Sequence, residues 1–365
     1  MYKQASKILS IQGIRAFAFL LIFISHCDYL IVSELGKNPL GYLGGWGVSI
    51  FLILSGYLSA RNLFFDNKLS ITELLKISYL KLQIRFIKIF PLHLFTLLIS
   101  FPFSYKALFF EFSLSKWLSL LVNIFLLQAW LPIKGDFNFV SWYLSVFLFI
   151  SFIGVFLCYF FQNNQKIRNK SFLIGMFLVI LQLIICIIFK NHSLSHKIIY
   201  FFPLTRIVDF IIGICLYYVS IEIKNVNKSN CCFIFGMVLG ILISYFSYGA
   251  ESEFFSVVLW SIPSFLIIIG TVSNTIPASS FLENKTIVWL GNISFELFLI
   301  HQLAIRYSYI VLRKIGYSPN VITYFMVFVL SVLFAVIWKN ISNKVIIKLP
   351  AAISTTISTK PNRIF

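Results

Sequence analysis

The segment IRAFAFLLIFISH, residues 14–26, carries an arginine near its start and a histidine at its end. The ten residues between Arg15 and His26 are all apolar except Ser25, which predicts a helix that spans a membrane. Eleven residues make three helical turns plus about 20°, so Arg15 and His26 share one face, about 16 Å apart along the axis. A charged group within lipid costs about 2.5 kcal/mol or more. We therefore expect this face to line a polar channel, although Arg15 alone is also compatible with a headgroup anchor and His26 alone with a hydrogen-bonded core histidine.

The rest of the chain has the same apolar character. Of its 365 residues, 59% are hydrophobic and 12% are charged, with a mean hydropathy of +0.91, whereas soluble domains have about 25% charged residues. Only helices and closed barrels span membranes, and the apolar runs are too long and uniform for barrel strands. The sequence predicts an all-α integral membrane protein, a polytopic bundle of about ten transmembrane helices plus one possible re-entrant segment. Eleven apolar segments are candidates: 11–32, 44–60, 86–103, 117–131, 142–161, 172–189, 201–219, 232–247, 254–272, 287–312 and 321–339.

The segment at 117–131 is short and contains polar residues, so we interpret it as re-entrant or interfacial, and the positive charges support leaving it out of the ten spans. The net charge of +18 favours lysine- and arginine-rich cytoplasmic loops rather than binding of nucleic acid. With ten spans, both termini are predicted to be cytoplasmic, and the loop with Glu251 and Glu253 lies outside. Lys190, Lys197 and the pair at 313–314 fit less well, on the outer side. We expect one membrane domain, 1–345, and a short cytoplasmic tail, 346–365, in the cell (inner) membrane; Arg15 argues against a cleaved signal peptide.

Further ionisable and polar residues lie inside the predicted spans. In NISFELFLIHQ (292–302), Ser294 and His301 are seven residues apart and share a helical face. In FFPLTRIVDFIIG (201–213), Arg206 and Asp209 are three apart and can form an ion pair, with either a structural or a direct role.

Three more stretches allow two interpretations each. Lys81, Arg85 and Lys88 form a stripe that is either a topological anchor or a cradle for phosphates. The small residues of GGWGVSIFLILSGYL (44–58), among them Ser55, permit close helix packing or contact with a ligand. Trp142 and Ser145 in SWYLS share a face at the outer start of a span, where tryptophan is common in any case.

The residue types favour group transfer. Histidine suits acid–base chemistry near neutral pH, and arginine suits bidentate recognition of phosphate. No acidic ladder for proton pumping and no metal-ligand spacing is visible, and the six cysteines read as small hydrophobes. A buried site with histidine and arginine fits transfer from a phosphate-bearing donor.

Six stretches together resemble the membrane-bound acyltransferase-3 family, in family order and over about residues 10–340. They are IQGIRAFAFLLIFISH (11–26), GVSIFLILSGYL (47–58), RFIKIFPL (85–92), SWYLSVF (141–147), RIVDFIIG (206–213) and LGNISFELFLIHQ (290–302). The sequence departs from the family pattern at four positions: Lys88 replaces an arginine, Phe147 a glutamate, Ser49 an aspartate or other polar residue, and Phe295 a tyrosine. Any acid–base role of that glutamate is absent here.

The resemblance implies an integral-membrane O-acyltransferase of a bacterial cell, which acetylates a cell-envelope sugar such as O-antigen, capsule or exopolysaccharide. Acetyl-CoA is the implied acyl donor, no permanently bound cofactor is expected, and the acceptor is a sugar or lipid-linked glycan among membrane lipids. Arg15, with Arg85 and Lys88, would engage the donor phosphates, and His26 would be the general base or an acyl carrier.

By the same resemblance, His301 and Ser294 complete the reaction chamber. The remaining substrate-binding candidates are Ser55, Trp142, Ser145, Arg206 and Asp209. The alternative is a non-enzymatic carrier or flippase of a lipid-linked glycan, which has no need for two histidines. An assembly or structural subunit would leave the buried Arg15–His26 face unexplained.

Overall fold

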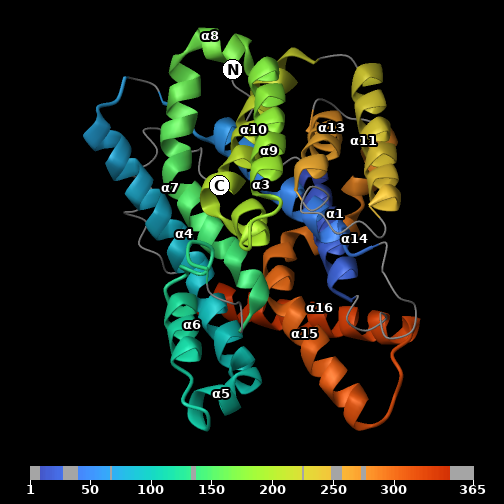
Figure 1. The fold of residues 1–365 in the computed structure, drawn as a ribbon. Coiled ribbons are helices and arrows are strands. Elements are labelled where there is room, and N and C mark those ends of the chain that lie inside the picture. The colour runs from blue at the N-terminus through green and yellow to red at the C-terminus, as the bar shows by residue number, and fades with distance from the viewer. Residues whose placement is uncertain are drawn as a thin grey trace.

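The protein is a bundle of helices in a computed structural model, which describes residues 9–27, 40–65, 68–132, 137–223, 226–247, 257–272 and 277–345 (Figure 1). No strand occurs in these ranges, so the predicted all-α fold is confirmed. Nine helices of the described residues are long and apolar enough to cross a membrane. They are α1 (Leu9–His26), α3 (Leu43–Asn62), α4 (Ile71–Ser100), α7 (Trp142–Asn163), α9 (Ser171–Phe189), α10 (Pro203–Glu222), α11 (Val226–Phe246), α15 (Ser294–Lys314) and α16 (Val321–Val345).

Two of the expected apolar segments form helices that are shorter than the nine long ones. The segment predicted to be re-entrant forms α6 (Leu114–Ile124), which has 11 residues and is too short to cross a bilayer. It lies with α5 (Tyr105–Phe109) at the lower end of the bundle in Figure 1. The expected span at 254–272 is also short: a 3₁₀ turn at Val258–Trp260 leads into α13 (Ser261–Val272), which packs against α11 and α3. The loop with Glu251 and Glu253, which was expected to lie outside, and the tail after residue 345 are not among the described residues.

Helix α4 begins earlier than its apolar run. The sequence predicted an apolar segment from residue 86 to 103, but α4 starts at Ile71, where Ser70 and Glu73 form a reciprocal capping box. The Ser70 hydroxyl accepts from the Glu73 amide at 3.3 Å, and the Glu73 carboxylate accepts from the Ser70 amide at 2.8 Å. The basic stripe at Lys81, Arg85 and Lys88 therefore lies in the middle of a 30-residue helix rather than at its end.

The expected span at 287–312 is broken into two helices. α14 (Lys285–Asn292) ends at Ile293, whose φ and ψ of −104° and 8° depart from helical values, and α15 starts at Ser294. Asn284 caps the start of α14 by accepting from the Thr286 amide at 2.9 Å. The break places the first turn of α15, with Ser294 and Glu296, in the interior, because both side chains are buried.

Helices α1 and α3 form the centre of the bundle. Within their most apolar windows, 61% and 78% of the residues are buried, against 22% in α9 and in α16. α3 packs closely on α10, where Gly56 faces the Phe210 carbonyl and Gly213 faces the Ile53 carbonyl. A Cβ atom at either glycine would overlap that backbone oxygen. The small residues of α3 thus serve close helix approach, which places the polar face of α1 in the middle of the protein.

Candidate active site

Two histidines from opposite ends of the chain meet at the C-terminal end of α1. The Nδ1 atom of His26 lies 2.8 Å from the Nε2 atom of His301 on α15, and the two rings are nearly parallel, at 7°. His301 is fully buried, and His26 is half-buried. The structure thus brings together the two residues that the sequence placed on separate helical faces.

The hydrogen bonds around the pair assign the protons. The second nitrogen of His301, Nδ1, lies 3.1 Å from the Leu297 carbonyl oxygen, to which it can only donate. In the neutral ring Nε2 is then an acceptor, so His26 Nδ1 donates to it. The remaining nitrogen, His26 Nε2, keeps a lone pair, and this is the arrangement of a general base oriented by a second group.

Phenylalanine rings surround the histidine pair. Phe19 and Phe23 on α1 have ring centroids 5.6 and 6.3 Å from that of His301, and Phe298 lies 6.1 Å away. Phe19 and Phe23 are themselves buried in the core. A dry environment of this kind strengthens electrostatic interactions and excludes competing water.

The segment before α7 is fastened to α15 beside His301. Asn138 Nδ2 donates to the Leu299 carbonyl at 2.9 Å, and the Val140 amide donates to Gln302 Oε1 at 3.2 Å. Because of these two bonds, α7 begins next to the histidine pair. Trp142 and Ser145 are both buried in this first turn of α7, and the Ser145 hydroxyl has no hydrogen-bond partner in the described part of the chain.

The ring of Trp142 belongs to an aromatic cluster. Its centroid lies 5.3 Å from that of Tyr200 and 4.9 Å from that of Phe201, both in the π-helical turn Lys197–Phe201. Lys197, in the same turn and between two spans, donates to the Gln128 carbonyl. Partial burial lowers the pKa of Lys197 to about 8.

Arginine side chains from three helices gather around Tyr143. Arg15 of α1, Arg85 of α4 and Arg206 of α10 all interact electrostatically with its hydroxyl, which also hydrogen-bonds to Ser55 of α3. Arg15 Nη1 donates to Gln12 Oε1 at 3.2 Å, and the Ser55 hydroxyl donates to the Phe51 carbonyl at 2.7 Å. The sequence did not single out Tyr143; its only signal was its place between Trp142 and Ser145.

Arg85 packs over Phe147, with its Cζ atom 5.3 Å from the ring centroid. At the position where the family pattern has a glutamate, this protein therefore places a cation–π contact. Lys88, one turn further along α4, is exposed and interacts electrostatically with Arg85. The predicted stripe continues in Lys81, which is buried and donates to Ser59 at 3.5 Å.

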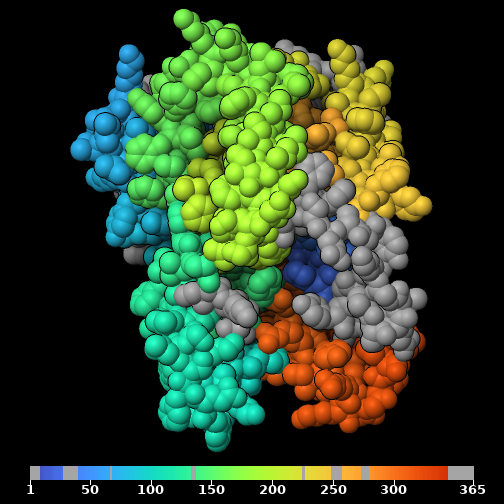
Figure 2. All heavy atoms as spheres, viewed as in Figure 1, coloured from blue at the N-terminus to red at the C-terminus, as the bar shows by residue number. Residues whose placement is uncertain are grey.

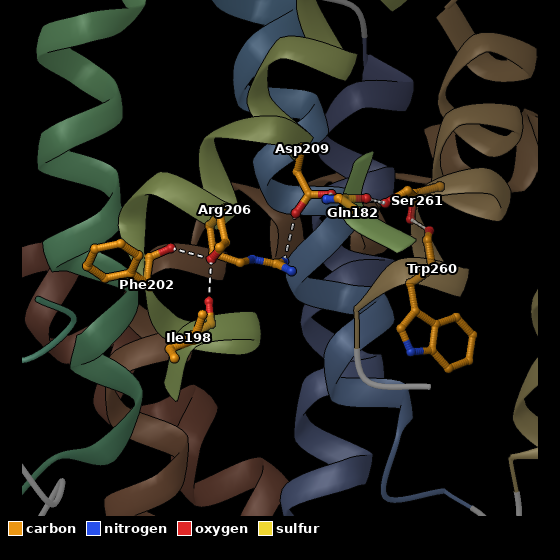
Figure 3. A network of polar contacts seen from close by, with 9 residues as sticks. Gln182, Ile198, Phe202, Arg206, Asp209, Trp260 and Ser261 are labelled. Atoms are coloured by element: carbon orange, nitrogen blue, oxygen red, sulfur yellow. Dashed lines mark hydrogen bonds and ion pairs between the residues drawn. The ribbon is translucent and has the colours of Figure 1, made fainter. Parts of the chain in front are cut away.

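Arg206 and Asp209 form a fully buried ion pair on α10, with 3.0 Å between Nη2 and Oδ2 (Figure 3). The other carboxylate oxygen, Oδ1, accepts from Gln182 Nε2 at 3.1 Å and from the Ser261 hydroxyl at 3.0 Å. Nε and Nη1 of Arg206 have no hydrogen-bond partner among the described residues. Side chains from α9, α10 and α13 thus hold the Asp209 carboxylate in place, and Asp209 in turn orients the Arg206 guanidinium. Arg206 keeps N–H groups that can donate to a bound substrate. Gln182 and Ser261 were not found from the sequence, since neither lies in a charged or motif-like context.

Ser294 is fully buried at the start of α15, and its hydroxyl has no hydrogen-bond partner in the described ranges. Within these ranges no cluster of three or more His, Cys, Asp or Glu side chains is placed to hold a metal ion. None of the six cysteines forms a disulfide. In Figure 2, dark blue atoms of α1 are visible on one face of the molecule, near yellow-green and orange segments.

Comparison with known proteins agrees with this chemistry. A family model described as an acyltransferase domain, of acyltransferase family 3, matches residues 8–338. The acyltransferase MdmB of Streptomyces mycarofaciens is 26% identical over 339 residues, which cover 85% of this chain and 82% of MdmB. No solved structure matches.

Proposed function

The chain belongs to the acyltransferase-3 family and is a multi-pass membrane acyltransferase, and from that premise we propose that it transfers an acetyl group from cytoplasmic acetyl-CoA to a hydroxyl of a cell-envelope sugar. An acyltransferase requires an acyl donor and an acceptor. The family membership makes a non-enzymatic carrier the weaker hypothesis.

The observation that carries the proposal is the histidine pair with its unprotonated His26 Nε2. In the proposed step, Nε2 takes the proton of the acceptor hydroxyl while the hydroxyl oxygen attacks the thioester carbonyl carbon. The carbon–sulfur bond then breaks, and the proton held on His26 passes to the departing thiolate, which leaves as the CoA thiol. His301 Nε2 accepts the hydrogen bond from His26 Nδ1 throughout and stabilises the imidazolium that forms on His26.

A second route uses the same atom. His26 Nε2 can attack the thioester carbonyl carbon itself, which breaks the carbon–sulfur bond and releases CoA thiolate. The acceptor hydroxyl oxygen then attacks the acyl-histidine, the bond between the acyl carbon and Nε2 breaks, and the hydroxyl proton passes to the thiolate. Both routes need the His301 contact and the same lone pair, so they share the residues but differ in whether His26 is acylated.

The basic residues support the assignment of the donor. Arg85 interacts electrostatically with Arg15 and with Lys88, and coenzyme A carries a diphosphate and a further phosphate that guanidinium groups bind bidentately. The acceptor side is proposed to be formed by Trp142, Ser145 and Arg206, where an aromatic ring and unpartnered donors are the groups that sugars use. Ser55 and Asp209 would position Tyr143 and Arg206, and Ser294 would border the chamber. We further propose that the protein lies in the inner membrane with both termini cytoplasmic, which requires the shorter apolar segment Val258–Val272 to complete a tenth crossing beside the nine long helices.

The direct test uses purified protein in detergent with acetyl-CoA and candidate glycans, and measures thioester consumption together with acetylated product by mass spectrometry. We expect acceptor-dependent consumption of thioester and a glycan heavier by one acetyl group. Glycans from cells with and without the gene should differ by the same mass. Binding of glycan without any thioester consumption would reject the proposal.

A further inference from the structure

A ring of interacting charged side chains, Arg15, Arg85, Lys88, Lys339 and Glu296, joins four helices, and the proposed donor site accounts for only part of it. Arg85 interacts electrostatically with Arg15 and with Lys88, and Lys88 interacts with Lys339 of α16. The ring closes through Glu296, which interacts with Arg15 and pairs with Lys339. Four cations and one carboxylate from α1, α4, α15 and α16 thus form a continuous circuit.

Glu296 is the acidic member of this ring and is almost completely buried. Its Oε1 atom lies 2.7 Å from Lys339 Nζ, and its side chain is 6% exposed. Its Oε2 atom is buried and has no hydrogen-bond partner in the described part of the chain. The position in the first turn of α15 favours a negative charge, because the helix dipole is positive there.

Lys339 is the least buried partner of the pair. Its side chain is 38% exposed, so it can leave Glu296 without passing through a packed core. The neighbouring Trp338 stacks on Phe95 of α4 with 4.8 Å between ring centroids, which holds α16 against the helix that carries Arg85 and Lys88. The backbone of α16 at Lys339 is therefore held close to Arg85 and Lys88, while the exposed side chain of Lys339 can move.

The charge balance of the ring favours an additional anion. Arg15, Arg85, Lys88 and Lys339 carry like charges and repel one another. One carboxylate neutralises one of them. A group with two or more negative charges is needed for the rest, and a diphosphate has that charge and enough oxygens to contact several cations.

We propose that Glu296 is a built-in counter-anion that occupies the ring when the donor is absent, and that the diphosphate of the donor competes with it and recruits Lys339 as a fourth cation. The inference rests on the proposed function for the identity of the donor, but the ring itself would bind any diphosphate. Glu296 is thus a positioning residue: it reduces the repulsion between the cations when no donor is bound, and it weakens donor binding because it competes with the diphosphate.

Neutralising Glu296 should then strengthen binding instead of weakening it. We expect Glu296→Gln to tighten coenzyme A binding about tenfold, or ~1.4 kcal/mol, and Lys339→Gln to weaken it by a similar factor. A pair that only joins α15 to α16 predicts a different result, since both substitutions would destabilise the protein and neither would tighten binding.

The experiment measures equilibrium binding of coenzyme A and, separately, of inorganic diphosphate to wild-type protein and both variants, with monodispersity checked in detergent. Glu283→Gln and Lys314→Gln remove the same charges at exposed positions and serve as controls. Tighter diphosphate binding by Glu296→Gln, and weaker binding by Lys339→Gln, support the ring.

Unchanged or weaker diphosphate binding by a monodisperse Glu296→Gln variant overturns it, as does the absence of diphosphate binding in every form. If Glu296→Gln is not monodisperse, Lys339→Gln decides alone, because full binding affinity in that variant also overturns the ring. Diphosphate binding without coenzyme A binding would leave the ring standing and reject the proposed donor.

Discussion

Among single residues, His26 and His301 have different tasks although they share one hydrogen bond. His301 is bonded at both nitrogens, to His26 and to the Leu297 carbonyl, and has no lone pair left. His26 has one nitrogen without such a bond among the contacts that the structure describes. His301 is therefore suited to hold His26 in one tautomer, and His26 is suited to exchange a proton with a substrate.

This asymmetry predicts unequal effects of substitution. We expect His26→Asn to abolish measurable acyl transfer, since a general base contributes about 10²–10⁴-fold in rate. His301→Gln should retain part of the activity, because the amide oxygen can still accept from His26 Nδ1, whereas His301→Leu should lose nearly all of it. The measurement is acyl transfer per molecule of monodisperse protein.

The chain contains a matched control for these variants. His93 in α4 is also fully buried, and its Nε2 atom lies 2.8 Å from the Asn123 carbonyl, outside the site. His93→Asn should alter stability but leave the turnover of the folded fraction close to wild type. Near-normal transfer by a folded His26→Asn protein would remove the catalytic role.

Arg15 offers a second test at this scale. We expect Arg15→Lys to raise the KM for acetyl-CoA strongly, because lysine keeps the charge but loses the planar two-point grip on phosphate. Steady-state kinetics with varied acetyl-CoA would measure it. An unchanged KM would show that Arg15 acts only as an anchor at the membrane surface.

At the same scale, the sequence predicted the shared face of Arg15 and His26 because helical periodicity alone decides it. It could not predict that His301 contacts His26, since that depends on how α1 and α15 pack. It could not join Glu296 to Lys339 either, because they lie on different helices and 43 residues apart. Tyr143 was missed because an aromatic residue in an apolar span has no distinguishing pattern.

At the scale of helices, the buried ion pair of Arg206 and Asp209 on α10 has either a structural or a functional role, and substitutions can distinguish the two. Asp209→Asn should cost about 3–5 kcal/mol, because it leaves the Arg206 guanidinium buried without a counter-ion. The double variant Arg206→Gln/Asp209→Asn should recover much of that stability. Activity in the double variant, measured beside its melting temperature, decides between the two: we expect a folded protein that does not acetylate, whereas full activity would make the pair purely structural.

The contact of α3 with α10 predicts a further difference. Gly213→Ala should destabilise the protein by about 1–3 kcal/mol or more, because its Cβ would overlap the Ile53 carbonyl oxygen and neither backbone can easily move. Gly175→Ala in α9 is the control, since the nearest atom to its Cβ is 3.9 Å away and alanine favours helix. Thermal unfolding in detergent measures both. Equal stability of the two variants would contradict the close packing of α3 on α10.

The helix positions were predicted best where one uninterrupted apolar run forms one uninterrupted helix. Nine of the ten expected spans correspond to long helices, and 117–131 is correctly short. The early start of α4 was missed because its capping box precedes a segment rich in charges. The break at Ile293 was missed because the apolar pattern continues through it, while backbone angles decide where a helix ends.

For the whole molecule, the charge distribution predicts an orientation that labelling can test. We expect Ser6→Cys and Ser354→Cys to react only from the cytoplasmic side and Ser252→Cys only from outside, because lysine and arginine concentrate in the inner loops. The background would replace exposed Cys231 and half-buried Cys232 by serine. Labelling of residues 252 and 354 from the same side would refute the topology.

The central position of α1 and α3 has a consequence for biosynthesis. These two helices leave the ribosome first and are the most enclosed in the finished protein, while α9, α11 and α16, which face outward, are made later. During translation, Arg15 and His26 therefore enter the bilayer or the insertion machinery before their partners Glu296 and His301 in α15 have been made. A chain that stalls before α15 would display an arginine and an unpaired histidine to lipid, where ionisable groups are costly. Deletions from the C-terminal side should accordingly shorten the lifetime of the whole chain rather than leave a stable N-terminal fragment.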